Sequence, residues 1–103
     1  MSLREALLDA LKPHSLRERL RLRITKGRTS IQLLERLPLE LQYALQEGPD
    51  NLTVAKRQAI HAVNHGLYSL IQEGLVVRQD VDLHMNLPGK GMRGIRVDVF
   101  RLL

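Results

Sequence analysis

A group of polar side chains that could read the edges of nucleic-acid bases lies between residues 53 and 74. Its members are Arg57, Gln58, His61, Asn64 and His65. An Arg can bind guanine through two parallel hydrogen bonds, and a Gln can bind adenine in the same way. Spacings of three and four residues place such side chains on neighbouring outer positions of a helix. The alternative is that they form the ordinary solvated face of an amphipathic helix.

The element that would carry these side chains is predicted to be a long helix over residues 53–74. Asp50, Asn51 and Thr53 supply turn and N-cap chemistry at its start. An apolar stripe follows at helical spacing and consists of Ile60, Val63, Leu67, Leu70 and Ile71. Small residues beside the stripe, including Gly66, predict that another backbone approaches closely there. Lys56 lies nearer the stripe, and we expect its stem to run along the protein while its charge reaches phosphate.

The remaining helices are predicted from their caps. Ser2 with Glu5, Ser15 with Glu18, and Thr29 with Gln32 each match the capping-box spacing. They predict a helix over 3–12, a second segment over 16–25 and a third helix starting after Thr29. Pro38 suits the first turn of a further short helix that runs to residue 46. Over 16–25 the apolar residues fit a helix or a strand, and the cap favours the helix.

The final third of the chain changes to a period of two, which is typical of strands. Val81, Leu83 and Met85 alternate with polar residues, and Ile95, Val97 and Val99 do so again further along. The two runs predict a β-hairpin whose long, flexible tip spans residues 86–94. Lys90 and Arg93 lie in that tip among glycines, where they are candidate phosphate contacts. The alternative is a hairpin tip that only adds solubility.

Positive charge is concentrated rather than spread. The chain of 103 residues has a net charge of +5, and residues 12–28 alone carry seven Lys and Arg against one Glu. Residues 29–55 form an acidic block with a net charge of −3. The basic run could bind phosphate, pair with the acidic block within or between subunits, or face solvent. Its candidate phosphate contacts are Arg19, Arg21, Arg23, Lys26 and Arg28.

The segment from Lys56 to Val76 resembles the recognition helix and exit of winged helix-turn-helix DNA-binding domains. The matching features are a polar start, Lys56-Arg57-Gln58-Ala59-Ile60, and an exit through Glu73-Gly74-Leu75-Val76 into a strand. The resemblance covers residues 29–103 and implies one α+β, mainly helical domain over 1–103. In that domain 29–74 form the helix-turn-helix region and 75–103 the wing hairpin. Residues 1–28 exceed the minimal winged helix and are expected to serve dimerisation.

Taken together, these features predict a small homodimeric transcriptional regulator that binds double-stranded DNA. A winged-helix module that binds protein, or a protein that binds RNA, remains the alternative. We expect no enzyme and no cofactor, since no phosphate-binding loop, nucleophile elbow or paired carboxylates occur. A metal clamp at His61 and His65 is not favoured, because Cys is absent and a third ligand is not evident. A cytoplasmic protein without export signal or membrane span is expected.

Overall fold

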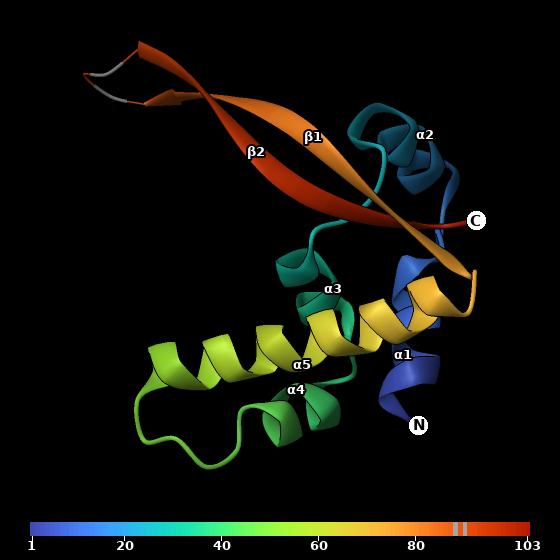
Figure 1. Ribbon diagram of the computed structural model, residues 1–103, viewed down its shortest axis with the longest axis vertical. Coiled ribbons are helices and arrows are strands. Elements are labelled where there is room, and N and C mark those ends of the chain that lie inside the picture. The colour runs from blue at the N-terminus through green and yellow to red at the C-terminus, as the bar shows by residue number, and fades with distance from the viewer. Residues whose placement is uncertain (88, 90) are drawn as a thin grey trace.

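The computed structural model describes residues 1–87, 89 and 91–103, apart from the side chains of residues 83–87, 92 and 93. The fold is α+β and mainly helical, as predicted. Its elements are α1 (Leu3–Leu11), α2 (Leu16–Thr25), α3 (Ser30–Arg36), α4 (Leu39–Leu45), α5 (Leu52–Gln72), β1 (Val76–Leu87) and β2 (Gly91–Leu102). Figure 1 shows α5 as the central rod, with the hairpin diverging from its C-terminal end.

The helix caps follow the predictions. The hydroxyls of Ser2, Ser15 and Thr29 each accept a hydrogen bond from the backbone N–H three residues later, and Thr29 with Gln32 forms a complete capping box. These bonds satisfy backbone donors that have no partner inside the helix. Residues 16–25 are a helix, so the favoured interpretation of the ambiguous segment is confirmed. This helix ends where Lys26 adopts a left-handed conformation, with φ at 65°.

Helix α5 begins one residue earlier than predicted and ends two residues earlier. Asn51 caps its start by accepting hydrogen bonds from the amides of Thr53 and Val54. Gly74 turns the chain toward β1 with φ at +79°. The expectation that a backbone approaches Gly66 is wrong: the near neighbour is a side chain. A Cβ on Gly66 would lie 2.7 Å from Leu7 Cδ1 of α1, so the glycine makes room for that leucine.

The hydrophobic core lies where α1, α3 and α5 meet the base of the hairpin. The largest fully buried side chains are those of Leu7, Leu33, Val63, Leu67, Leu70 and Val76. Phe100 of β2 closes this core and is 5% exposed. The apolar stripe predicted on the long helix is therefore its buried face, with Ile60 and Ile71 half-buried at the margin. The core holds the C-terminal half of α5 and the base of the hairpin in one fixed arrangement.

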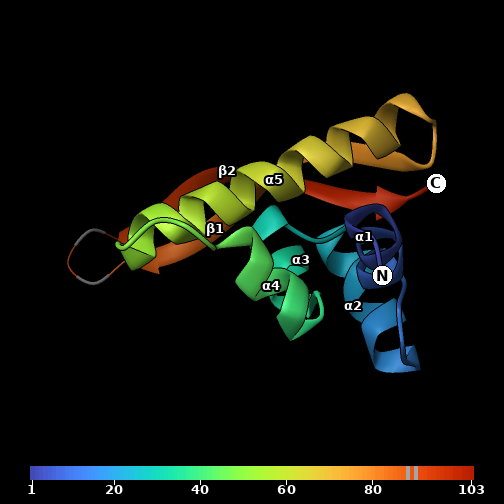
Figure 2. The ribbon, with the colours of Figure 1, turned by 90° about the horizontal axis from the view of Figure 1, so that it is seen from below.

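The strands of the hairpin are longer than predicted. Their antiparallel pairing continues from Val76 opposite Leu102 to Leu87 opposite Gly91. The prediction of a long tip over 86–94 is wrong, because the ladder set by the buried base carries on through Gly91 and Gly94. Lys90 lies outside the described residues. Both Figure 1 and the view turned by 90° in Figure 2 place the distal part of the hairpin at the same end of the molecule as the start of α5.

The hairpin is joined to the helices by a short third strand-like segment. Arg28 and Phe100 exchange two backbone hydrogen bonds, of 2.9 and 2.8 Å. Gly27 precedes this bridge with φ at +152°, and a Cβ there would lie 2.7 Å from the carbonyl oxygen of Phe100. Only a glycine lets the two backbones approach so closely. The bridge therefore ties the start of α3 to the base of the hairpin.

Helix α2 contributes no buried residue. Its half-buried Leu22 faces the hairpin base, whereas Leu16, Leu20 and Ile24 are 72%, 54% and 82% exposed. Spacings of four residues place these three side chains in one exposed row. Among the described residues, no helix combines the length and apolar character that a membrane crossing requires.

Candidate nucleic-acid interface

An exposed row of cationic and titratable side chains runs along the N-terminal two thirds of α5. Arg57, His61 and His65 are all exposed and follow one another at intervals of four residues, about one helical turn each. These three side chains line a shallow surface depression together with Val54, Gln58 and Ala62. The structure thus brings three of the predicted site residues onto one accessible face. Lys56 is also exposed, but it stands about 100° around the helix from Arg57.

The amide group of Gln58 is already engaged within the protein. Its Nε2 donates hydrogen bonds to the carbonyl oxygens of Leu45 and Glu47, each at 3.0 Å. These carbonyls end α4 and begin the turn that leads to α5. Reading adenine requires both the donor and the acceptor of a glutamine amide. The donor is committed here, so the geometry favours a positioning role for Gln58, which holds α4 against α5.

Asn64 is likewise bound to a neighbouring helix. Its Oδ1 accepts a hydrogen bond from Ser30 Oγ at the start of α3, in a half-buried position. This contact fixes α3 relative to the middle of α5. Asn64 therefore lies beside the exposed row rather than in it. Asn64 also lines a groove between α5 and the hairpin.

That groove has a volume of about 410 Å³. From α5 it is lined by Ile60, Asn64 and Tyr68, and from the hairpin by Arg78, Asp98 and Phe100. Arg78 Nη1 donates to the Tyr68 hydroxyl at 3.4 Å and lies 3.9 Å from an oxygen of Asp98. These contacts join the exposed side of α5 to the hairpin above the core.

The middle of the hairpin carries both signs of charge. Arg96 lies 3.8 Å from Asp80 and 3.5 Å from Asp82, and its side chain is highly exposed. Cross-strand pairs of this kind are worth a few tenths of a kcal/mol each. Of the predicted wing contacts, the whole of Lys90 and the side chain of Arg93 lie outside the described residues.

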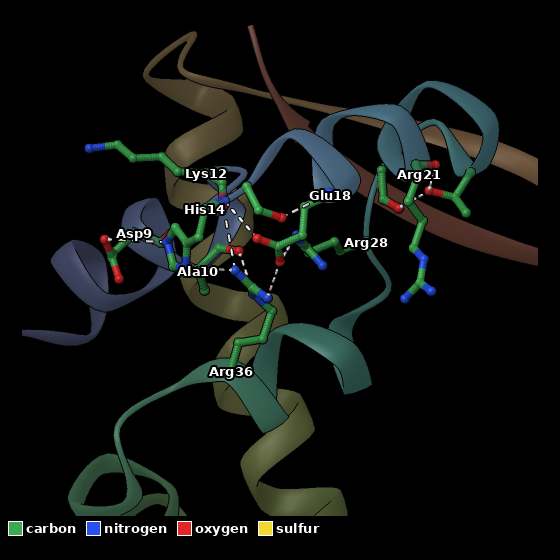
Figure 3. Close-up of polar contacts among 11 residues, drawn as sticks. Asp9, Ala10, Lys12, His14, Glu18, Arg21, Arg28 and Arg36 are labelled. Atoms are coloured by element: carbon green, nitrogen blue, oxygen red, sulfur yellow. Dashed lines mark hydrogen bonds and ion pairs between the residues drawn. The ribbon is translucent and has the colours of Figure 1, made fainter.

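A carboxylate in the basic run organises the junction of α1, α2 and α3 (Figure 3). Glu18 Oε1 accepts from Arg28 Nη2 at 3.0 Å and from Arg36 Nη1 at 2.6 Å. Glu18 Oε2 accepts from the backbone N–H of His14 at 2.7 Å. Arg36 also donates from Nε to the carbonyl of Ala10 at 3.0 Å. Three helices are thus held by one acid and two guanidinium groups.

This cluster corrects the expectations for the basic run. Arg28 is mostly buried and paired with Glu18, so it is not available to phosphate in this arrangement. Burial lowers the pKa of Arg28, yet a guanidinium stays charged at neutral pH. In the described part of the chain, no Lys or Arg of the run pairs with a carboxylate of the acidic block 29–55, and the ion pair that joins the two segments has the opposite sense, from Arg36 of the block to Glu18 of the run. The acid that meets the run is Glu18, the one acid inside it, and its capping-box position was the only sequence signal.

The electrostatics of Glu18 follow from these contacts. The hydrogen bond from the His14 backbone is the largest influence that lowers the pKa of Glu18, and Arg36 and Arg28 lower it further against a partial opposing effect of burial. A carboxyl group with a lowered pKa in the folded state stabilises the fold above its ordinary pKa of 4.5. That contribution is lost as the pH falls through the lowered value.

Glu18→Gln should therefore reduce the melting temperature at pH 7 and weaken its dependence on pH below about 4.5. Thermal unfolding followed by circular dichroism between pH 7 and pH 2.5 measures both effects. Glu40→Gln, at an exposed position of α4, is the matched control and should keep the wild-type acid dependence. If the melting temperature of Glu18→Gln falls with acid as steeply as that of the wild type, the role assigned to this carboxylate is contradicted.

The other cations of the basic run remain exposed. Arg19, Arg21, Arg23 and Lys26 have no carboxylate within 4.0 Å in the portion of the chain that the structure covers. They are free to meet an anionic partner, unlike Arg28. Among the described residues there is also no group of three or more His, Cys, Asp and Glu side chains that could hold a metal ion.

The candidate interface therefore consists of the exposed row on α5, the groove beside it and the adjoining hairpin. It contains hydrogen-bond donors and positive charge on an element of the right width for a DNA groove. Comparisons of the chain with models of protein families, with curated protein sequences and with solved structures find no match.

Proposed function

We propose that the protein binds double-stranded DNA, with the exposed face of α5 in the major groove and the hairpin as a wing on phosphate or in the minor groove. The observation that carries the proposal is the row Arg57, His61 and His65. The three side chains are exposed at helical spacing, and within the described structure none has a carboxylate within 4.0 Å. A helix about 10–12 Å wide fits a major groove of about 12 Å.

The order of the elements supports a winged helix-turn-helix arrangement. Helices α3 and α4 precede the longer α5, and a two-stranded hairpin follows directly. The bridge between Arg28 and Phe100 adds a third strand-like segment at the base of that hairpin. In this arrangement α5 is the recognition helix and the hairpin is the wing.

The side chains divide into two roles under this proposal. Arg57 reads a base, with His61 and His65 contacting bases or phosphates further along the groove. Gln58 and Asn64 hold α4 and α3 in place against α5 through the hydrogen bonds already described. Lys56 contributes positive charge near the backbone.

We further propose that the protein acts as a homodimeric transcriptional regulator. The exposed row of Leu16, Leu20 and Ile24 on α2 supports an additional contact, because such a row has no partner within the described fold. A second copy of the chain would cover it and place two recognition helices on one DNA site. Two half-sites give the specificity that a single helix lacks.

A protein-binding module is the second candidate function. It is favoured by the exposed apolar Leu52 and Val54 at the start of α5, which are 70% and 48% exposed. Asp80 and Asp82 on the hairpin would also repel phosphate. Both features would suit a partner protein with apolar and basic groups.

Selection of binding sites from a random duplex pool, followed by sequencing, tests the proposed function. A DNA-binding dimer should enrich a palindromic site. Its affinity should fall with salt, with a slope of log affinity against log salt of about −0.9 for each phosphate neutralised. Enrichment of a single half-site would contradict the proposed homodimer but would leave DNA binding in place. No enrichment and no duplex binding at low salt would reject DNA binding and favour the protein-binding module.

A further inference from the structure

A basic hollow lies between the C-terminal part of α2 and the base of the hairpin, away from the α5 interface. Its volume is about 480 Å³. The walls are formed by Arg19, Leu22, Arg23 and Lys26 from α2 and its cap, together with Gln79 and Arg101 from the strands. Segments far apart in the sequence thus bring four cations to one place. The sequence alone placed Arg101 in no functional group.

Helical geometry explains why only part of the basic run reaches the hollow. At about 100° per residue, Arg19, Arg23 and Lys26 lie along the flank of α2 beside Leu22, which faces the hairpin. Arg17 and Arg21 lie on the opposite flank, beyond the exposed apolar row. The basic run is therefore two separate groups, and only one of them is combined with residues of the strands.

The cations of this hollow have no carboxylate partner among the residues that line it. None of the described lining residues is acidic, while Asp80 and Asp82 line an adjoining depression beside Lys26 and Gln79. Across the residues that the structure describes, no carboxylate lies within 4.0 Å of any of its four cations. The C-terminal end of α2 contributes a partial negative charge of about half a unit, which is too small to offset four positive ones. The uncompensated charge favours an anionic ligand with several negative groups.

We infer that this hollow binds the phosphate backbone of a nucleic-acid duplex. Arginine presents a planar fork of donors that matches two phosphate oxygens, and two of these arginines stand one helical turn apart. Gln79 adds an uncharged amide beside them. Pockets for small molecules enclose most of the ligand surface. This hollow is instead open and rimmed by cations, as suits a polymer that passes across it.

The hollow and the α5 interface lie on opposite faces of the hairpin. Successive residues of a strand point to opposite faces. Arg78 and Phe100 point toward α5, where they line the groove beside Tyr68. Gln79 and Arg101, each one residue further along, point toward α2. Figure 1 shows α2 and α5 on the two sides of the hairpin.

A duplex in the hollow is therefore a different segment from one held by α5, and one protein can bridge two segments. The bridging rests on the proposed function for the first segment. Binding in the hollow does not depend on it.

The test compares Arg19→Ala/Arg23→Ala with Lys12→Ala/Arg17→Ala, a control pair that removes the same charge from exposed positions outside the lining of the hollow. Each protein is titrated with a short fluorescent duplex over a range of salt. Bridging is measured as retention of that duplex on beads that carry a second, unlabelled duplex. Circular dichroism checks that the exposed substitutions leave the fold intact, and Arg57→Ala reports on the α5 interface separately.

We expect Arg19→Ala/Arg23→Ala to reduce the salt slope by about 1.8, for two lost phosphate contacts, and to abolish bridging. The control pair should keep the wild-type salt slope and the ability to bridge two duplexes. Equal effects of the two pairs, or bridging that survives in Arg19→Ala/Arg23→Ala, would overturn the inference. If Arg57→Ala changes nothing while Arg19→Ala/Arg23→Ala abolishes binding, the hollow stands and the proposed role of α5 fails.

Discussion

Replacing Arg57 with alanine should weaken binding to the preferred DNA site by about 1–3 kcal/mol and broaden the sequence preference. Arg57 is exposed on α5, and the described residues offer it no carboxylate partner that would have to be given up on binding. The measurement is fluorescence anisotropy with the selected duplex and with a scrambled duplex of the same composition. The loss should be larger on the selected duplex, because base contacts carry the specificity.

Arg57→Lys is the control for this prediction. It retains the charge but loses the fork that binds guanine through two hydrogen bonds. We expect it to bind scrambled DNA as the wild type does, while discriminating poorly between sequences. Equal losses on selected and scrambled DNA for Arg57→Ala would reject base reading by this residue. Arg57 would then contact phosphate alone.

Replacing Gly27 with alanine should destabilise the fold by about 2–4 kcal/mol, from an unfavourable backbone conformation and from weakened bridge hydrogen bonds. The φ of +152° is disfavoured for residues with a Cβ, and that Cβ would lie 2.7 Å from the carbonyl oxygen of Phe100. The neighbouring atom belongs to the backbone, which cannot relieve the contact by changing rotamer as a side chain can. Chemical denaturation gives the free energy of unfolding directly.

Gly48→Ala separates the two causes. Gly48 also has a positive φ, at +112°, but no atom of the described residues lies within 4 Å of a Cβ built there. Gly48→Ala should therefore lose only the stability that the unfavourable backbone conformation costs, about 1–2 kcal/mol. A loss in Gly27→Ala no greater than in Gly48→Ala would show that the close approach to Phe100 matters little. Because that approach ties the hairpin base to α3, we also expect Gly27→Ala to weaken any binding that uses the hairpin together with α5.

Local signals predicted the helices well because they act over three or four residues. Ser2, Ser15 and Thr29 each cap a helix from within its own first turn, and the stripe of Val63, Leu67 and Leu70 follows from helical spacing alone. Residues 16–25 were ambiguous by periodicity, and the cap at Ser15 indicated the correct structure. The hairpin tip was predicted too long, because pairing between strands depends on the partner strand rather than on local composition.

The roles of individual polar side chains could not be predicted, because their partners are distant in the sequence. Gln58 donates to carbonyls 11 and 13 residues away, and Asn64 accepts from Ser30, 34 residues away. In the sequence both were candidate base contacts like Arg57, yet the amide donor of Gln58 and the amide oxygen of Asn64 are engaged inside the protein. Glu18 likewise meets Arg36 across 18 residues.

The sequence by itself determined the helices, the hairpin and the exposed cationic face of the long helix, since caps, periodicity and charge are local properties. Only the tertiary structure decided which cations are available to a partner. Arg28 forms an ion pair with Glu18, whereas Arg23 lines an open hollow together with Arg101 from the other end of the chain. The physical reason is that the availability of a charge depends on what packs around it, and that is decided by contacts between residues far apart in the chain.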